Sequence, residues 1–200
     1  MKLGQFFLLG RKTEEAREKA EIVLEKEPGN IDAHFLQMGV LIQEGKPDEA
    51  TEVLKKVTSL DEKNIKAYLA LASIAGRQKQ PAEAKNYLDM AVAASPDDPT
   101  PRLALARFHE QRGEYQEAEK EIREAVFRNP ENEMILGGLG NFLVRRGDLK
   151  GAETAYLKME QLAPDKVSPK MTLGAFYASQ KDWEKALQWT EKARELQPEN

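Results

Sequence analysis

Proline recurs at a fixed interval along this chain of 200 residues. Four prolines follow one another at intervals of 34 residues, and a fifth precedes them by 68 residues, which is twice that interval. They are Pro28, Pro96, Pro130, Pro164 and Pro198. A fixed period of this length indicates a repeat architecture, in which each repeat is one supersecondary unit packed against its neighbours. The predicted repeats are 1–30 (partial, lacking its start), 31–64, 65–98, 99–132, 133–166 and 167–200.

Small and apolar residues recur at the same positions of the repeats. Position 20 is alanine in all six, position 7 is leucine in five, and position 8 is glycine or alanine in five. Positions 4, 7, 8 and 11 form one face of a helix, and positions 20, 24 and 27 form one face of a second helix. Turn signals such as EGKP and QRGEY lie between them. Each repeat is therefore predicted to be a pair of antiparallel helices that approach closely at the small residues, and the fold class is all-α.

Further prolines predict where these helices begin and end. Pro47 and Pro81 fall at the start of second helices, where a missing backbone N–H costs nothing. The proline at position 32 is expected to end each second helix. Thr100 and Ser168, each followed by a proline, are predicted to cap the next first helix.

The combined pattern resembles the tetratricopeptide repeat. It consists of leucine and a small residue at positions 7 and 8, an aromatic residue at position 11 or 17, alanine at positions 20 and 27, and proline at position 32. The resemblance covers all 200 residues, with a local departure at His34, Gln37 and Met38. It implies a single domain, a right-handed α-α superhelix (solenoid) of stacked antiparallel helix pairs. RNA-binding helical repeats of 35 residues fit less well, because the period is 34 and the chain is acidic.

The opening stretch MKLGQFFLLG fits the same phase. Leu3, Gly4 and Phe7 fall at positions 7, 8 and 11, so the stretch is predicted to be the latter part of a first helix. A secretory signal would need a longer apolar core and a small-residue cleavage site. Because the first repeat starts at position 5 and no polar cap follows the last, we expect a segment of a longer protein. The alternative is a chain whose open ends pair in a dimer.

Composition excludes several classes of function. The net charge is −4 and the pI is near 5.5, which argues against a nucleic-acid partner. The absence of cysteine rules out disulfides, thiolate catalysis and cysteine-based zinc sites. No apolar run approaches the roughly 20 residues needed to cross a bilayer. The compartment stays open between cytoplasm and periplasm.

No catalytic constellation stands out, so we expect neither an enzyme nor a cofactor or metal site. His34 and His109 fall at core positions of different repeats and are predicted to be packed or hydrogen-bonded there. Gly137, Gly138 and Gly140 are not preceded by a predicted strand or followed by Gly-Lys-Ser/Thr, so a close helix crossing is favoured over a phosphate loop.

The resemblance implies that a peptide lies along the first helices, which line the concave surface at positions 2, 5, 6, 9, 12 and 13. The predicted groove residues are Phe35, Lys66, Leu69, Ser73, Arg77, Leu103, Arg107, Gln111, Met134, Asn141 and Arg145. The family's clamp for C-terminal carboxylates is not expected, since Gly137 and Ala70 stand where it needs cationic side chains.

The groove positions carry more basic than acidic residues. Five cations (Lys2, Lys66, Arg77, Arg107 and Arg145) against Asp32 and Glu110 give five minus two, or +3, in a chain of net charge −4. Arginines there could hold carboxylates through paired hydrogen bonds. The alternative is that they pair with Glu110 or remain solvated.

Three functions follow as hypotheses. The first is a protein-interaction scaffold that binds a protein or peptide in the groove. The second is a substrate-recruiting or targeting arm of a larger enzyme or of an envelope or secretion assembly protein. The third is a structural solenoid that self-associates end to end, which concentration-dependent mass would reveal.

Overall fold

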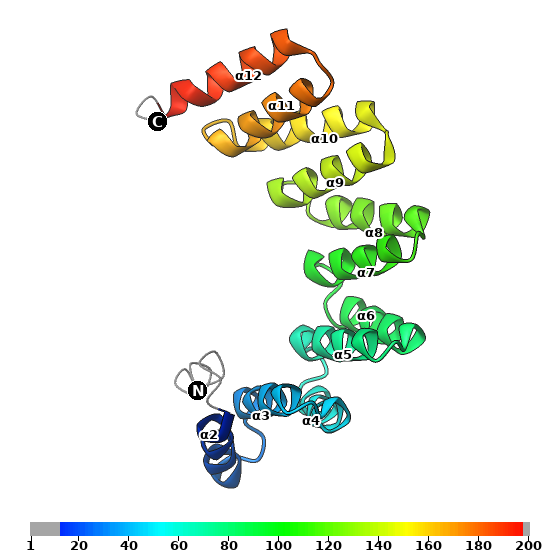
Figure 1. Cartoon of the computed structure of the whole chain (residues 1–200), viewed down its shortest axis with the longest axis vertical. Coiled ribbons are helices and arrows are strands. Elements are labelled where there is room, and N and C mark those ends of the chain that lie inside the picture. The colour runs from blue at the N-terminus through cyan, green and yellow to red at the C-terminus, as the bar shows by residue number, and fades with distance from the viewer. Residues whose placement is uncertain (1–12, 198–200) are drawn as a thin grey trace. The chain divides into compact units, whose positions relative to one another are not determined.

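The computed structural model describes residues 13–197. In this range the chain forms eleven α-helices and no strand, which confirms the all-α prediction (Figure 1). They are α2 (Thr13–Lys26), α3 (Ile31–Gln43), α4 (Pro47–Leu60), α5 (Ile65–Arg77), α6 (Pro81–Ala94), α7 (Pro99–Gln111), α8 (Tyr115–Arg128), α9 (Glu133–Arg146), α10 (Leu149–Leu162), α11 (Val167–Ser179) and α12 (Trp183–Leu196). The predictions for Lys2, Leu3, Gly4 and Phe7 concern residues outside the described range.

The chain divides into two compact units, whose boundary lies within α7. In the N-terminal unit (residues 1–105), α2, α3, α4, α5 and α6 pack on one another in chain order. In the C-terminal unit (residues 106–200), α8 to α12 do the same. Four predicted repeats are therefore seen as packed helix pairs: α3 with α4, α5 with α6, α9 with α10, and α11 with α12.

The recurring spacing of small residues corresponds to the contacts between paired helices. The alanine at position 20 is buried in all six repeats. Gly140 on α9 packs so closely on α10 that a Cβ at this position would lie 2.3 Å from the Tyr156 ring. Leu139, one residue earlier, is buried as well. The small residues let the helix axes approach, while neighbouring leucines fill the remaining core.

The second helices begin and end where the prolines predict. Pro47 and Pro81 are the first residues of α4 and α6, as expected. α8 ends at Arg128, two residues before a proline at position 32. α4 ends at the same place in its repeat, at Leu60, although its position 32 is Glu62. The proline is thus compatible with the helix end without being required for it.

The predicted caps of the first helices are wrong. Thr100 and Ser168 lie inside the first turns of α7 and α11 instead of preceding them. The prolines that follow them are tolerated there, because the first backbone N–H groups of a helix have no intrahelical acceptor to lose.

In α3, α5 and α9 the cap is the asparagine at position 34, the residue just before the helix, whereas Lys166 before α11 provides no side-chain cap. The Asn30 side chain accepts a hydrogen bond from Ala33 N at 3.0 Å, and Asn64 accepts one from Ala67 N at 3.0 Å. Asn132 accepts from Met134 N at 3.1 Å. Asparagine is among the strongest N-caps, so this column of asparagines was a sequence signal for the start of the helix.

Candidate ligand-binding surface

All predicted groove residues lie on first helices, and none of them is buried. Phe35 lies on α3. Leu103, Arg107 and Gln111 lie on α7, the helix that contains the boundary between the two units. The remaining ones are on α5 and α9. By unit, the N-terminal unit holds Phe35, Lys66, Leu69, Ser73, Arg77 and Leu103, and the C-terminal unit holds Arg107, Gln111, Met134, Asn141 and Arg145.

In the N-terminal unit, α5 presents a basic face. Lys66, Ser73 and Arg77 are exposed and are spaced by seven and four residues, which places them on one side of the helix. Leu69 lies beside them and is half-buried. Eleven residues separate the two cations, which is about 16 Å along a helix.

In the C-terminal unit, α9 presents a different face, which we call the α9 stripe: Met134, Gly138, Asn141 and Arg145. These residues are spaced by four, three and four positions, so they form one line along the helix, and all four are exposed. Met134 is the most exposed of them, at 81%. The stripe therefore runs from an apolar end to a polar and charged end.

Asn141 is held in place by the neighbouring helix. The Tyr156 hydroxyl on α10 donates a hydrogen bond to Asn141 Oδ1 at 2.7 Å. Tyr156 is buried, and this burial raises the pKa of its hydroxyl, so that the group stays protonated and able to donate. With its oxygen engaged, Asn141 is left with its amide N–H groups to offer to a ligand.

Arg145 forms an ion pair with Glu110 on α7. Its Nε and Nη2 lie 2.9 and 2.8 Å from Glu110 Oε1. This pairing is the alternative that the sequence left open for the groove arginines. Both side chains are partly exposed, so the pair contributes little to stability and a competing carboxylate can displace Glu110.

The glycines of α9 have two different roles. Gly140 is buried against the Tyr156 ring, which confirms the predicted close helix crossing. A Cβ on Gly138 would meet nothing within 4 Å. Because glycine has no side chain, no group projects from the helix backbone at the middle of the α9 stripe. Gly137 lies beside the stripe, where a Cβ would approach Met159 Sδ to 3.0 Å.

A surface depression continues the stripe beyond Met134. It has a volume of about 750 Å³ and lies between the loop that joins α8 to α9 and the loop that joins α10 to α11. Its lining includes Met134, Leu162 and the ion pair between Lys166 and Glu133. The sequence did not indicate this depression, since its residues come from two loops that only the packed repeats bring together.

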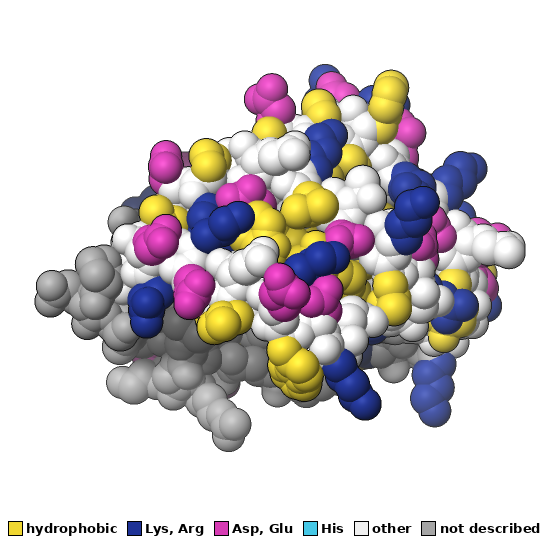
Figure 2. Space-filling model, turned by 90° about the horizontal axis from the view of Figure 1, so that it is seen from above, with side chains coloured by type: hydrophobic (Ala, Val, Ile, Leu, Met, Phe, Trp, Pro, Cys, Tyr) yellow, Lys and Arg dark blue, Asp and Glu magenta, His cyan; other side chains and the backbone are white. Residues whose placement is uncertain are grey.

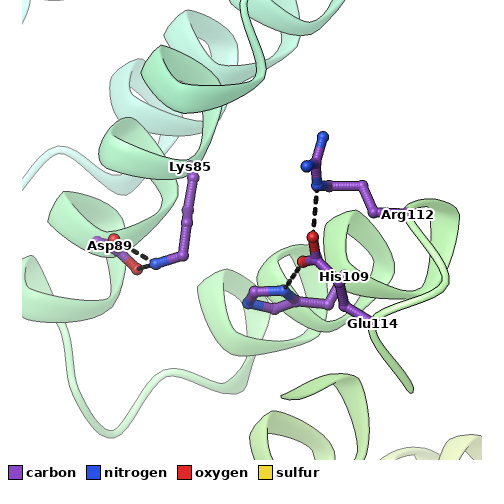
Figure 3. Close-up of polar contacts among 5 residues, drawn as sticks. All are labelled: Lys85, Asp89, His109, Arg112 and Glu114. Atoms are coloured by element: carbon purple, nitrogen blue, oxygen red, sulfur yellow. Dashed lines mark hydrogen bonds and ion pairs between the residues drawn. The ribbon is translucent and has the colours of Figure 1, made fainter. Parts of the chain in front are cut away.

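The two histidines are structural, as predicted. His34 is buried and its Nε2 lies 2.9 Å from the carbonyl oxygen of Pro28. His109 Nδ1–H donates to Glu114 at 2.7 Å, and Arg112 Nε donates to the other carboxylate oxygen at 2.8 Å (Figure 3). These two donors, His109 first, lower the pKa of the Glu114 carboxyl.

Figure 3 also shows the ion pair between Lys85 and Asp89, 2.8 Å apart and one turn apart on α6.

Across residues 13–197, no group of three or more His, Asp or Glu side chains is placed to hold a metal ion. The described helices include none long and apolar enough to span a membrane.

Packed helix pairs with an exposed stripe of mixed chemistry define a helical-repeat protein of the kind that typically serves as an interaction scaffold. A model of the tetratricopeptide repeat family matches residues 8–75, 41–99 and 75–141. The chain belongs to the tetratricopeptide repeat family. The scaffolds of this fold are typically non-catalytic, and no catalytic family matches the chain.

Solved structures support the same fold. MamA is 21% identical, with 80% of this chain and 94% of that chain covered and a TM-score of 0.59. YrrB, described as a TPR protein with an unusual peptide-binding site, is 20% identical, with 92% and 95% covered and a TM-score of 0.55. PilW, described as a type IV pilus biogenesis factor, is 17% identical, with 100% and 92% covered and a TM-score of 0.66. No curated protein sequence matches the chain.

Proposed function

We propose that this chain is a non-catalytic scaffold that binds an extended segment of a partner protein along the α9 stripe. The observation that carries the proposal is the line of four exposed residues on α9, apolar at Met134 and polar at Asn141 and Arg145. The exposed methionine supplies an adaptable apolar contact. The other end supplies directed hydrogen-bond donors and a cation.

The dimensions of the stripe are the basis for the kind of ligand we propose. Met134 and Arg145 are eleven residues apart, which is about 16 Å along a helix. An extended peptide covers this distance with about five residues. The matching segment has an apolar side chain against Met134 and an acidic side chain about four or five residues away for Arg145.

Two neighbouring groups add to this recognition. The N–H groups of Asn141 are suited to a backbone carbonyl of the peptide, because the Tyr156 hydroxyl already occupies the Asn141 oxygen. Arg107 and Gln111 on α7 are exposed in the same unit and offer further donors. The peptide-binding site named in the description of YrrB supports this type of function by analogy of fold.

Selection from a random peptide display library tests the proposal. The library is panned against the wild-type chain, the Arg107→Ala/Arg145→Ala variant, and a control variant, Lys120→Ala/Lys158→Ala, which removes two exposed cations from second helices. We expect enriched peptides with an apolar residue and an acidic residue at the predicted spacing. Their affinity should fall about tenfold or more for the arginine variant and stay unchanged for the control.

Two outcomes contradict the proposal. The first is a library that yields no shared motif. The second is a set of enriched peptides that bind both double variants equally well, since affinity would then not depend on the groove arginines.

A further inference from the structure

The surface depression beyond Met134 differs in chemistry from the α9 stripe that it adjoins. We call it the loop depression, and its lining consists of residues 129–134, where α8 is joined to α9, and residues 162–166, where α10 is joined to α11. Met134 belongs to both surfaces, so a segment that lies on the stripe can continue into the depression. The packed helices α11 and α12 follow these loops, so the depression does not result from where the sequence stops.

Carboxylates outnumber cations in this lining. Glu131 and Glu133 come from the first loop, and Asp165 comes from the second. Against these three carboxylates stands one cation of the lining, Lys166, which forms an ion pair with Glu133. Glu131 and Asp165 are exposed, and neither forms an ion pair within residues 13–197. The depression is thus left with two unbalanced negative charges, one on each loop.

The lining also offers apolar surface. Met134 is exposed, and Leu162 is 39% exposed. Lysine and arginine suit this combination, because their aliphatic stems pack on apolar surface while the charged end stays with polar groups. An aliphatic side chain would leave the carboxylates unused, and an acidic one would be repelled by them.

The ends of the second helices favour a cation at the same place. α8 ends at Arg128 and α10 ends at Leu162, so the last carbonyl groups of both helices, which carry partial negative charge, lie beside the depression. The positive end of α9 is already occupied by the Asn132 side chain, which accepts hydrogen bonds from the first turn. α11 has no side-chain cap at its start, so an anion bound there is the competing outcome.

The surface around α12 does not have this imbalance of charge. Figure 2, which looks down on the side where α12 lies in Figure 1, shows basic, acidic and hydrophobic side chains interspersed. α12 itself carries three carboxylates and three cations, namely Glu184, Glu191 and Glu195 against Lys185, Lys192 and Arg194. Charge therefore selects a ligand at the loop depression and does not select one at α12.

We propose that the loop depression binds a lysine or arginine side chain of the partner segment that lies on the α9 stripe. The charged end of this side chain pairs with Glu131 and Asp165, and its stem packs on Met134 and Leu162. The inference rests on the proposed function and extends it, because it adds a third element to the ligand. This element is a basic residue beyond the apolar one, on the side away from the acidic residue.

The affinities of synthetic peptides for the whole chain test the proposal. Each peptide carries a leucine, a glutamate four residues away, and a variable residue two positions beyond the leucine on the other side, so that all three side chains share one face of an extended strand. The variable residue is Lys, Gln or Glu, and each peptide is made in both sequence directions. We expect the lysine peptide to bind about fivefold more tightly than the glutamine peptide, and the glutamate peptide to bind most weakly.

Variants of the chain locate this preference. Glu131→Gln/Asp165→Asn should abolish the advantage of the lysine peptide and leave the affinity of the glutamine peptide unchanged. Lys166→Gln should increase the advantage, because Glu133 then has no cation of its own. The matched control is Glu117→Gln/Glu191→Gln, which removes two exposed carboxylates from α8 and α12. Added salt should reduce the advantage.

A second probe separates this proposal from the proposed function. The peptide acetyl-Lys-Ser-Leu amide has no acidic residue, and its titration into the labelled chain is followed by NMR. We expect amide shifts within residues 129–134 and 162–166 that Glu131→Gln/Asp165→Asn removes, whether or not the longer peptides bind along α9. Longer peptides that bind along α9 without a preference for lysine would contradict only the loop depression.

Three results would overturn the proposal. One is equal affinity for the lysine and glutamine peptides, or a lysine preference that Glu131→Gln/Asp165→Asn leaves intact. Another is a short lysine peptide that leaves the amides of both loops unmoved. The third is tightest binding of the glutamate peptide, because the depression would then hold an anion at the start of α11.

Discussion

The first helices α5 and α9 share a buried face and differ in their exposed one. Inside, α5 places Leu71 and Ala72 where α9 places Leu139 and Gly140, and all four are buried. Outside, the two helices diverge at three of the four positions along the stripe. Reading from the N-terminal end, the corresponding pairs are Lys66 and Met134, Ala70 and Gly138, Ser73 and Asn141, and Arg77 and Arg145; Ala70 is partly buried and the other seven are exposed.

This comparison separates the residues that build the repeat from those to which the proposed function assigns specificity. The buried positions are constrained by the distance between helix axes, and α5 and α9 both carry a small residue at position 8, Ala72 and Gly140. The exposed positions carry no such constraint. On α9 they form an apolar-to-polar gradient, whereas on α5 they form a basic face.

The largest expected effect comes from the buried glycine. Gly140→Ala should destabilise the chain by about 2–3 kcal/mol, because the added Cβ would lie 2.3 Å from the Tyr156 ring and force the helices apart. Gly138→Ala on the same helix is the matched control, and it should stabilise by about 0.5–1 kcal/mol, since alanine favours a helix. Thermal and denaturant unfolding measure both. Changes of the same sign and size would contradict the assigned packing.

Exchanging the exposed residues tests the specificity of the α9 stripe. Met134→Lys/Asn141→Ser gives α9 the side chains of α5 at two positions and should weaken the selected peptide about tenfold, because the apolar contact and the directed amide are lost. The free energy of unfolding should fall by about 1 kcal/mol, because Asn141→Ser removes the acceptor of the buried Tyr156 hydroxyl, while Met134 is exposed and its change should cost little.

The control for this exchange is the reciprocal change Lys66→Met/Ser73→Asn on α5, measured with the same peptide by calorimetry. Two results would contradict the assignment of specificity to the α9 stripe. One is peptide affinity that the α9 exchange leaves unchanged, and the other is an equal loss of affinity from the α5 exchange.

Removing one hydroxyl should have a smaller effect. Tyr156→Phe deletes the hydrogen bond to Asn141 while preserving the ring, and should cost about 1 kcal/mol of stability. It should also weaken the peptide severalfold, because the Asn141 amide is no longer held in one orientation. Asn141→Ala in the Tyr156→Phe background gives the double-mutant cycle, and additive effects on binding would show that the two residues act independently.

The smallest effect is expected at the ion pair of Arg145. Glu110→Gln should change stability by less than about 0.5 kcal/mol, because the pair is partly exposed. The same change should tighten the binding of acidic peptides, since their carboxylate no longer competes with Glu110. Titration of wild type and variant at two salt concentrations measures this. A weaker affinity in the variant would mean that Glu110 itself contacts the ligand.

The 34-residue period allowed the helix pairs and their core positions to be predicted, and the family resemblance placed Asn141 and Arg145 on the exposed face of a first helix. Periodicity specifies which side of a helix faces the core, and little more. The sequence offered pairing with Glu110 only as an alternative for the groove arginines and did not single out Arg145, 35 residues away, as the partner. It gave no indication that the Tyr156 hydroxyl reaches Asn141. Those contacts depend on the distance between neighbouring helices and on side-chain rotamers.

The misplaced caps have a different cause. The asparagines at position 34, Asn30, Asn64 and Asn132, were visible in the sequence, but the prolines after Thr100 and Ser168 suggested a later helix start. Proline is compatible with several places in the first turn. Before α7 and α11, position 34 is Asp98 and Lys166, so the asparagines of the other repeats indicated this boundary only through the shared repeat phase.

The central claim is that the α9 stripe recognises a peptide, and NMR tests it most directly. The measurement is the change in backbone and side-chain amide shifts of the labelled chain when a library-selected peptide is added. The account predicts the largest changes between residues 134 and 145 and at the Asn141 side-chain amide, with smaller ones at Arg107 and Gln111. Changes concentrated on second helices, with the α9 amides unmoved, would contradict it.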